Sequence, residues 1–164
     1  MLDLALGTNM GDKVRNLEKA IKEIERQIGT VVSRSAFVST EPWGFQSDNG
    51  FLNACIGVDT DISPELVLQR CQMIEKKMGR KTKSTKEILP DGTVRHIYHD
   101  RVIDIDIIIY DELIIHTPTL TIPHPLMDKR KFVLEPLAQI AAELKIPGTQ
   151  ISVAEMLRAL EAEA

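Results

Sequence analysis

The apolar positions of the chain follow one period typical of helices and another typical of strands. Between residues 12 and 29 they recur three and four positions apart, which predicts an amphipathic helix lying on a sheet. A second helix is predicted over residues 63–79, because Ser63, Pro64 and Glu65 open it as an N-cap, a first-turn proline and a first-turn acid. Ser152 and Glu155 have the spacing of a capping box, which predicts a last helix over residues 153–162.

Runs of β-branched and other apolar residues predict strands at 2–6, 30–40, 51–60, 101–110 and 113–115. A strong turn signal at 89–93, with short apolar runs on both sides, predicts a projecting β-hairpin within residues 80–100. Residues 127–134 are predicted to form a basic turn or short helix, and residues 136–144 another short helix. The order β-α-β-β-α-β with a helical tail predicts an α+β fold, in a single domain over residues 1–164.

Two carboxylates interrupt the most apolar of these strands. Asp104 and Asp106 are two positions apart, so they share one face while Ile103, Ile105 and Ile107 share the other. Ionised side chains on such a strand are unfavourable unless they are solvated, paired or bound to a cation. Mg²⁺ prefers one or two carboxylates together with phosphate oxygens, so one hypothesis is a metal and phosphate site. The alternative is a solvent-facing surface that carries two aspartates by chance.

Other side chains leave both a structural and a functional interpretation open. Trp43 in the loop 41–50 either fills the core or stacks on a flat ligand, and Asn53 needs partners from a heterocycle or from backbone. Gln72 and Glu75 are three apart on a helix, where most such pairs form a solvated flank. The basic segment 80–100 suits either a lid over a nucleotide or a surface insertion, and its two histidines lack a third zinc ligand.

Composition narrows the class of protein. A hydrophobic content of 43% and a charged content of 27% argue against long disorder, and a net charge of −4 argues against a nucleic-acid-binding protein. Its 2 cysteines have no C-x-x-C spacing, which favours reduced thiols in the cytoplasm. We find neither a signal peptide nor an apolar run long enough for a membrane span, so a cytoplasmic protein without membrane contact is expected.

Several short motifs then occur in a characteristic order. They are ALGTNMGD at 5–12, EPWGF at 41–45 with FLNA at 51–54, IE at 74–75 followed by GR at 79–80, RVIDID at 101–106, and IPH at 122–124 followed by Arg130 and Phe132. Together they resemble the 6-hydroxymethyl-7,8-dihydropterin pyrophosphokinase family. These enzymes of folate biosynthesis move the β,γ-pyrophosphoryl group of ATP onto the pterin hydroxymethyl group and release AMP. The resemblance implies a ferredoxin-like βαββαβ antiparallel sheet with helices on one face, and two Mg²⁺ ions.

The resemblance also implies a role for individual residues. Asp104 and Asp106 match the metal ligands, Asp104 also faces the substrate, and Arg80 and Arg101 match catalytic arginines that contact the nucleotide phosphates. The other positions on the nucleotide side are Gln72, Glu75, Ile107, Thr121, His124 and Arg130. The positions of the pterin pocket are Thr40, Pro42, Trp43, Phe51, Asn53 and Phe132. The implied partners are therefore two small molecules, ATP and a reduced pterin, bound by a monomer.

Three positions depart from the family pattern. Thr82 and Thr119 stand where the family often has arginine, and Pro125 stands where an aromatic residue commonly follows the histidine. The segment between Gly79 and Arg101 is longer than usual, and Tyr98 is the candidate for its closing aromatic residue. An alternative is a non-catalytic ferredoxin-like module that binds a small ligand. Such a module could lack Arg80, Arg101 or one aspartate, and this chain has all of them.

Overall fold

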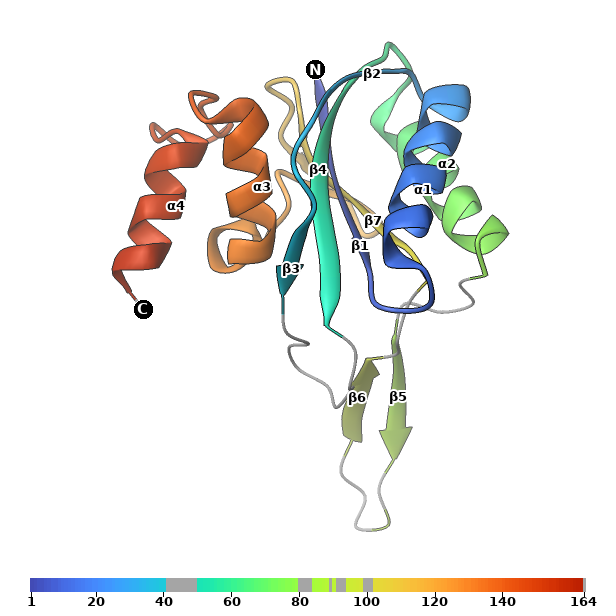
Figure 1. Ribbon diagram of the computed structural model, residues 1–164. Helices are drawn as coiled ribbons and strands as arrows, with labels where there is room; N and C mark the ends of the chain where they lie inside the picture. Colours follow the sequence, from blue (N-terminus) through green and yellow to red (C-terminus); the bar gives the residue numbers. More distant parts are fainter. Residues whose placement is uncertain (41–49, 80–83, 89, 91–93, 99–101, 164) are drawn as a thin grey trace.

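The computed structural model describes residues 1–40, 50–79, 84–88, 90, 94–98 and 102–163 (Figure 1). Its strands are β1 Leu2–Thr8, β2 Thr30–Arg34, β3 Val38–Thr40, β4 Phe51–Asp59, β5 Ser84–Ile88, β6 Val94–Tyr98, β7 Asp104–Tyr110, β8 Ile115–His116 and β9 Thr121–Ile122. Its helices are α1 Lys13–Gln27, α2 Pro64–Lys77, the 3₁₀ turn η1 Met127–Lys129, α3 Lys131–Ala141 and α4 Val153–Ala162. The predicted α+β class is confirmed.

The main sheet is antiparallel and has the order β2-β4-β1-β7, with β3 paired to β4 beyond the end of β2. β1 therefore lies between β4 and β7. Its residue Ala5 is paired with Cys55 on one side and Asp106 on the other. Two residues further along β1, on the same face, Gly7 is paired with Asn53 and Asp104 in the same way.

Helices α1 and α2 cover one face of this sheet, as predicted (Figure 1). Alternate residues of the strands point into the layer between sheet and helices, because strand side chains alternate with period two. This core includes Leu4 of β1, Ile56 of β4, Ile105 of β7, Ile24 of α1 and Ile74 of α2, which are all buried. Burial of each such side chain contributes roughly 1.5–3 kcal/mol, which fixes the register of the strands.

The helical tail packs on the opposite face of the sheet. Val133 and Leu137 of α3 and Val153 of α4 form a second core with Cys55 of β4 and Ile108 of β7. The carbonyl of Val133 accepts a hydrogen bond from the Cys55 thiol over 3.6 Å, which ties the first turn of α3 to β4. Helices therefore cover both faces of the sheet. The sequence predicted a helical tail but did not indicate that it packs on the second face.

The single strand predicted over residues 30–40 is wrong. The structure has β2 and β3 instead, separated by residues 35–37. The Ser35 hydroxyl accepts a hydrogen bond from the Cys55 amide over 2.9 Å, and the Ser35 amide donates to the Cys55 carbonyl over 2.9 Å. A serine side chain thus replaces part of the regular ladder, as short hydroxyl side chains do at turns.

The predicted helix start at Pro136 is also wrong, because α3 begins at Lys131 and has Pro136 inside it. An internal proline removes one helical hydrogen bond. Here Pro136 is buried together with Leu134 and Leu137, so packing against the sheet offsets that loss. The predicted last helix and its Ser152 capping box are confirmed.

Two smaller elements were predicted with different success. The hairpin is confirmed, since β5 and β6 pair in an antiparallel register from Ser84 with Tyr98 to Ile88 with Val94. The short strand expected at 113–115 is shifted to β8. Asp111, at a φ of 49°, and a hydrogen bond of 3.0 Å from the Leu113 amide to the Tyr110 carbonyl form a turn first.

Candidate functional site

The two aspartates lie at the start of β7, on the face opposite Ile103, Ile105 and Ile107. Both are partly exposed, whereas the isoleucines between and beside them are buried in the core. A register shift at Asp3 and Leu4 of β1 places an extra residue in β7 further along the strand, and both Ile108 and Ile109 join the second core there. Polar side chains therefore occupy only the first part of the strand on this face.

A glycine separates the aspartates from the amide on β4. Gly7 of β1 is the Cα partner of both Asn53 and Asp104, so these three residues form one row across the sheet. A Cβ atom at Gly7 would lie 3.0 Å from Asn53 Oδ1 and 3.6 Å from Phe51 Cδ1. The absence of a side chain at Gly7 thus leaves room above β1 between an amide and a carboxylate.

Asn53 is 5% exposed and hydrogen-bonded within the sheet. Its Nδ2 donates to Thr40 Oγ1 over 3.0 Å, and the Val38 carbonyl lies 3.5 Å from the same nitrogen. Thr40 is paired with Phe51, so the threonine, the amide and the aromatic ring share one face. Three positions predicted for a pterin pocket are thus brought together.

Glu75 approaches the aspartate strand from the other face. Its carboxylate accepts a hydrogen bond from the Ile105 amide over 2.8 Å, at the residue between the two aspartates, and its side chain is 4% exposed. Gln72, three residues earlier on α2, is exposed. The interpretation of this pair as a solvated flank is therefore wrong for Glu75.

Other residues predicted for the nucleotide side follow β7 in the chain and contact it. The His124 amide donates to the Ile108 carbonyl over 2.9 Å, and β9 with Thr121 contacts β7. His124 Nδ1 accepts a hydrogen bond from the Leu126 amide over 3.2 Å, which leaves Nε2 as the proton-bearing nitrogen of the neutral ring. Ile107 differs from its neighbours, because its side chain is buried in the first core and faces away from the aspartates.

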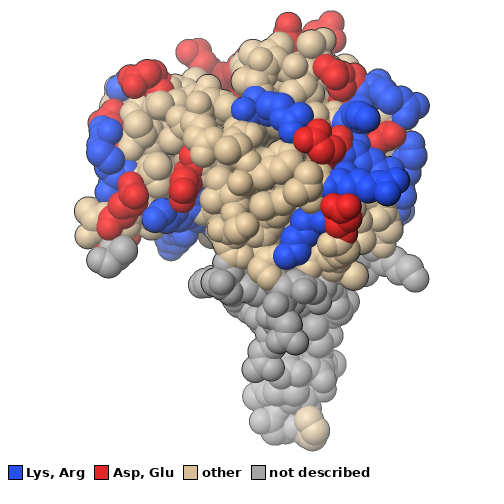
Figure 2. All heavy atoms as spheres, in the orientation of Figure 1, with Lys and Arg blue, Asp and Glu red and all other residues tan. Residues whose placement is uncertain are grey.

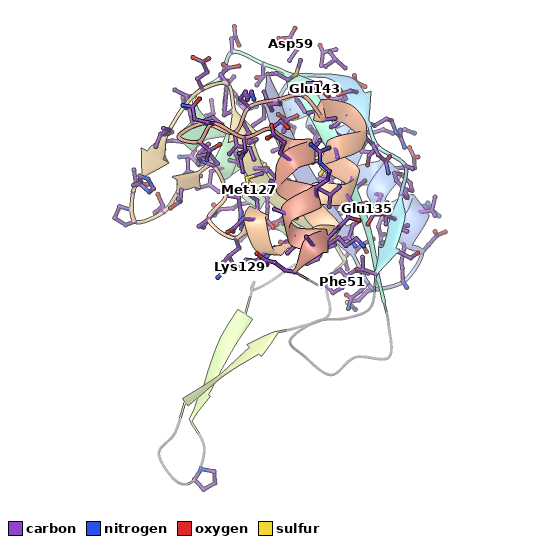
Figure 3. All side chains as sticks on the ribbon, turned by 90° about the vertical axis from the view of Figure 1, so that its left-hand side faces the viewer. Phe51, Asp59, Met127, Lys129, Glu135 and Glu143 are labelled. Atoms are coloured by element: carbon purple, nitrogen blue, oxygen red, sulfur yellow. The ribbon has the colours of Figure 1, made fainter. Side chains whose placement is uncertain are left out.

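Arg130 and Phe132 stand together where α3 begins. The Arg130 guanidinium lies 5.6 Å from the centre of the Phe132 ring, within the range of a cation–π contact. Phe132 is partly buried against the second core, on the helix whose first turn is tied to β4. Figure 3 shows Phe51 and Lys129 at the end of the molecule from which the β5–β6 hairpin projects, and Asp59 and Glu143 at the opposite end.

Four predicted site residues lie outside the residues that the structure describes: Arg80, Arg101, Pro42 and Trp43. Two described residues, Gly7 and Asn16, contribute to the site in ways that the sequence did not indicate. The motif at 5–12 was noticed, but the place of Gly7 between Asn53 and Asp104 depends on strand pairing. Asn16 of α1 donates to Thr8 Oγ1 over 3.2 Å and to the Met10 carbonyl over 2.7 Å, and so holds the turn that follows β1.

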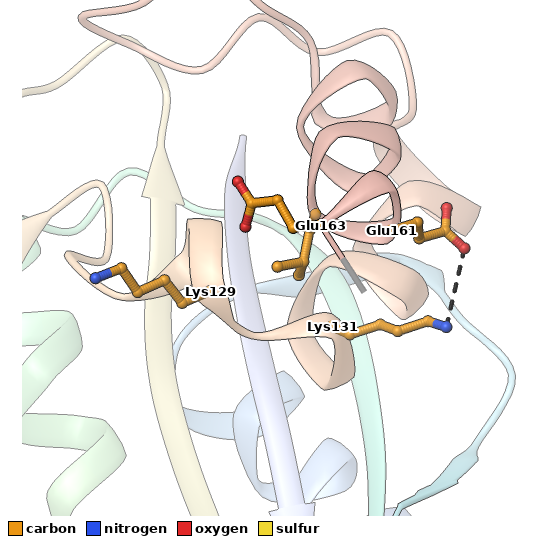
Figure 4. Close-up of a pocket in the computed structure, with 5 residues that line it drawn as sticks. Lys129, Lys131, Glu161 and Glu163 are labelled. Atoms are coloured by element: carbon orange, nitrogen blue, oxygen red, sulfur yellow. Dashed lines mark ion pairs between the residues drawn. The ribbon is translucent and has the colours of Figure 1, made fainter.

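A separate hollow of ≈ 500 Å³ lies between η1, the start of α3 and the end of α4 (Figure 4). Its lining includes Lys131 and Glu161, whose charged groups are 3.9 Å apart, and also Lys129, Leu160 and Glu163. None of the predicted site residues that the structure describes lines it. A shallow surface that carries both signs of charge has no evident preference for a phosphate, so we do not place the site there.

The donor set at Asp104 and Asp106 suits a hard cation. No group of three or more potential ligands among His, Cys, Asp and Glu occurs within the described residues. Zinc sites usually need such a group, whereas Mg²⁺ is commonly held by one or two carboxylates, water and substrate phosphates. In the view of Figure 2, acidic and basic side chains lie next to one another at both sides of the molecule, and a mostly uncharged area lies between the two groups. Within the residues that the structure describes, no helix is long and apolar enough to span a membrane.

Comparison with known proteins identifies the family. The family model described as 7,8-dihydro-6-hydroxymethylpterin-pyrophosphokinase (HPPK) matches residues 3–142. The chain belongs to this family. One relative, the 2-amino-4-hydroxy-6-hydroxymethyldihydropteridine pyrophosphokinase of Porphyromonas gingivalis, is 39% identical over 139 residues, which are 84% of this chain and 88% of the relative. The enzyme of the same name from Methylorubrum extorquens is 36% identical over 149 residues, which are 90% and 87% of the two chains.

Solved structures support the fold of this HPPK family member. A crystal structure of Plasmodium falciparum HPPK-DHPS with pteroate aligns with a TM-score of 0.77 and 15% identity, over 99% of this chain. The alignment covers 44% of that larger protein, so this chain spans less than half of its length. At this identity the likeness concerns the fold alone, and it confirms the ferredoxin-like α+β prediction. The alternative of a non-catalytic binding module is not favoured by membership of a pyrophosphokinase family.

Proposed function

We infer that this chain transfers the β,γ-pyrophosphoryl group of ATP to the hydroxymethyl group of 6-hydroxymethyl-7,8-dihydropterin, a step of folate biosynthesis. The observation that carries this conclusion is the row Asn53–Gly7–Asp104, with Asp106 beside it. The Asn53 amide can hydrogen-bond a heterocycle, and the two carboxylates can bind a metal–phosphate complex. Gly7, which has no side chain, lies between the amide and Asp104. The names of the family and of its relatives describe the same reaction.

We propose that Asp104 and Asp106 hold two Mg²⁺ ions. When bound, the ions would neutralise charge on the transferring group and lower the pKa of the attacking hydroxyl. The chain's own part is to keep the two carboxylates on one face of a strand whose other face is anchored in the core. Such fixed groups need little reorganisation as charge develops, which is where electrostatic catalysis gains most.

Other residues position the nucleotide. Glu75 accepts from the Ile105 amide, so α2 fixes the backbone between the two aspartates. We propose that Arg80 and Arg101 make forked contacts with phosphate oxygens, a geometry for which guanidinium is suited. Gln72, Ile107, Thr121, His124 and Arg130 are assigned to the nucleotide side because they match the family positions; the His124 proton on Nε2 is a candidate donor.

The pterin side consists of an amide and aromatic walls. Asn53 would hydrogen-bond the ring edge, while Phe51 and Phe132 would stack on its faces. The Asn53 amide donates a hydrogen bond to Thr40 Oγ1. Pro42 and Trp43 are assigned to the same pocket from their family positions.

The metal role is tested by replacing one carboxylate. We expect Asp106→Asn to lower the rate of AMP formation by about 100-fold or more, because the loss of one preorganised charge in an active site has this order of effect. The exposed Asp59, at the opposite end of the molecule (Figure 3), supplies the matched control Asp59→Asn, which should keep the wild-type rate. Full turnover by Asp106→Asn, with a circular dichroism spectrum like that of the wild type, would contradict the assignment.

A further inference from the structure

We propose that Lys129 is a further nucleotide-binding residue of this site, and that its ammonium group contacts the phosphates of ATP. The inference rests on the function proposed above, and it concerns a residue outside the motifs that carry the family resemblance. Lys129 is exposed and ends the short 3₁₀ turn η1.

The turn η1 is fixed to β7 through His124. The His124 amide donates to the Ile108 carbonyl of β7 over 2.9 Å, and the His124 carbonyl accepts a hydrogen bond from the Met127 amide over 3.3 Å. Met127 is 3% exposed and packs in the second core, so η1 lies on the second face of the sheet. The backbone that carries Lys129 is therefore held on the face to which the two aspartates of β7 belong.

Lys129 also lies at the same end of the sheet as the aspartates. β4 and β7 are both antiparallel to β1, so they run in the same direction and begin at the same end of the sheet. Phe51 is the first residue of β4, and Asp104 is the first residue of β7. Figure 3 shows Lys129 and Phe51 at this end. Lys129 thus shares both the face and the end of the sheet with Asp104.

The two cations that follow Lys129 in the chain already have partners. The Arg130 guanidinium lies 5.6 Å from the centre of the Phe132 ring, and Lys131 Nζ lies 3.9 Å from a carboxylate oxygen of Glu161. Lys129 forms no ion pair with another residue that the structure describes. In Figure 4 the side chain of Lys131 extends toward Glu161, whereas that of Lys129 extends in the opposite direction. Its ammonium group is consequently available to a bound anion.

The nucleotide brings a charge that such a group stabilises. The triphosphate and the two aspartates of β7 together carry more negative charge than two Mg²⁺ ions neutralise, so the complex needs cations from the protein. The chain as a whole has a net charge of −4, so these cations have to be local. An ammonium group without a protein partner gives up only water when it donates to a phosphate oxygen, and hydrogen bonds between charged groups are among the strongest. Lys131 would have to leave Glu161 first.

The test removes one positive charge at each of two nearby lysines. Calorimetry with Mg²⁺ measures the Kd of a non-hydrolysable ATP analogue for wild type, Lys129→Gln and the control Lys131→Gln. Both substitutions lower the net charge by one, so a difference between them reports direct contact. We expect Lys129→Gln to raise the Kd about 10-fold. Lys131→Gln should change it by less than about two-fold, because an exposed ion pair contributes little. Lys129→Arg keeps the charge and should bind like wild type.

Steady-state kinetics separate binding from a general disturbance of η1. A contact that is equally strong before and during the reaction raises KM for ATP and leaves kcat unchanged, so we expect this result for Lys129→Gln. The Kd of the dihydropterin at saturating nucleotide should also stay at the wild-type value.

An unchanged Kd for the ATP analogue in Lys129→Gln would overturn the inference, and so would an equal rise in Lys129→Gln and Lys131→Gln. A loss in Lys129→Arg as large as that in Lys129→Gln would show a structural role instead of a charge contact. Circular dichroism of each variant establishes that it is folded. Formation of AMP by wild type separates the two proposals: if AMP forms but the two lysine variants bind alike, only the inference about Lys129 fails.

Discussion

At the scale of single residues, Asp3 has an unusual environment on β1, two residues from Ala5, the Cα partner of Asp106. It is 3% exposed, and its Oδ2 atom has no hydrogen-bond partner in the part of the chain that the structure describes. Burial raises the pKa of this carboxyl to about 6, the positive N-terminus of Met1 lowers it, and Asp111 raises it slightly. The N-terminal ammonium is itself paired with Asp111.

Asp3 therefore makes stability depend on pH. Its pKa is 3.8 when unperturbed and about 6 in the folded chain, so its favourable contribution is complete below pH 3.8 and is lost as the pH rises through 6. The difference amounts to about 3 kcal/mol of unfolding free energy. We expect Asp3→Asn to be more stable than wild type at pH 8 and to lose this advantage by pH 4. Urea unfolding at both pH values measures it, and parallel pH profiles would contradict the account.

Gly7 provides a second test at a single position. A Cβ atom there would be 3.0 Å from Asn53 Oδ1, so Gly7→Ala must displace the amide or fill the gap between amide and carboxylate. We expect the Kd for the dihydropterin to rise about 10-fold while the Kd for Mg-ATP stays unchanged. Calorimetry on the same sample gives both values. An equal loss for both ligands would indicate a general disturbance of the sheet and not a pterin gap.

At the scale of elements, the contact between α2 and β7 fixes the backbone between Asp104 and Asp106, because Glu75 accepts a hydrogen bond from the Ile105 amide. Glu75→Ala would leave the buried Ile105 amide without its acceptor, so we expect a loss of about 1–3 kcal/mol in unfolding free energy. The exposed Gln72 lies on the same helix, and Gln72→Ala should change stability by less than about 0.5 kcal/mol. Chemical denaturation of the pair measures the difference; similar values for both variants would exclude this role of Glu75.

What the sequence predicted depends on how local each signal is. The common face of Asp104 and Asp106 follows from the period of one strand, and α1 and the Ser152 cap follow from spacing within one helix. Glu75 was not predicted to be buried, because its partner Ile105 is 30 positions away. Pro136 was taken for a helix start, since packing of α3 on the second face of the sheet outweighs the local preference of proline.

At the scale of the whole molecule, the sheet has two different faces. One is covered by α1 and α2 and forms a continuous apolar core. The other is apolar where α3 and α4 cover it and polar in the row Asn53–Gly7–Asp104. Strand pairing thus brings together side chains from separate motifs in the sequence. The assignment of Mg²⁺, of a monomer and of each site residue stays a prediction, while the family and fold are established.

The central claim is that two phosphoryl groups move together from ATP to the pterin. The most direct measurement is ³¹P NMR of the chain incubated with ATP, Mg²⁺ and 6-hydroxymethyl-7,8-dihydropterin. We predict that AMP and a pterin diphosphate appear in equal amounts, and that both are absent when the pterin is omitted. Formation of ADP with a pterin monophosphate, or of AMP with free pyrophosphate in the absence of pterin, would contradict the account.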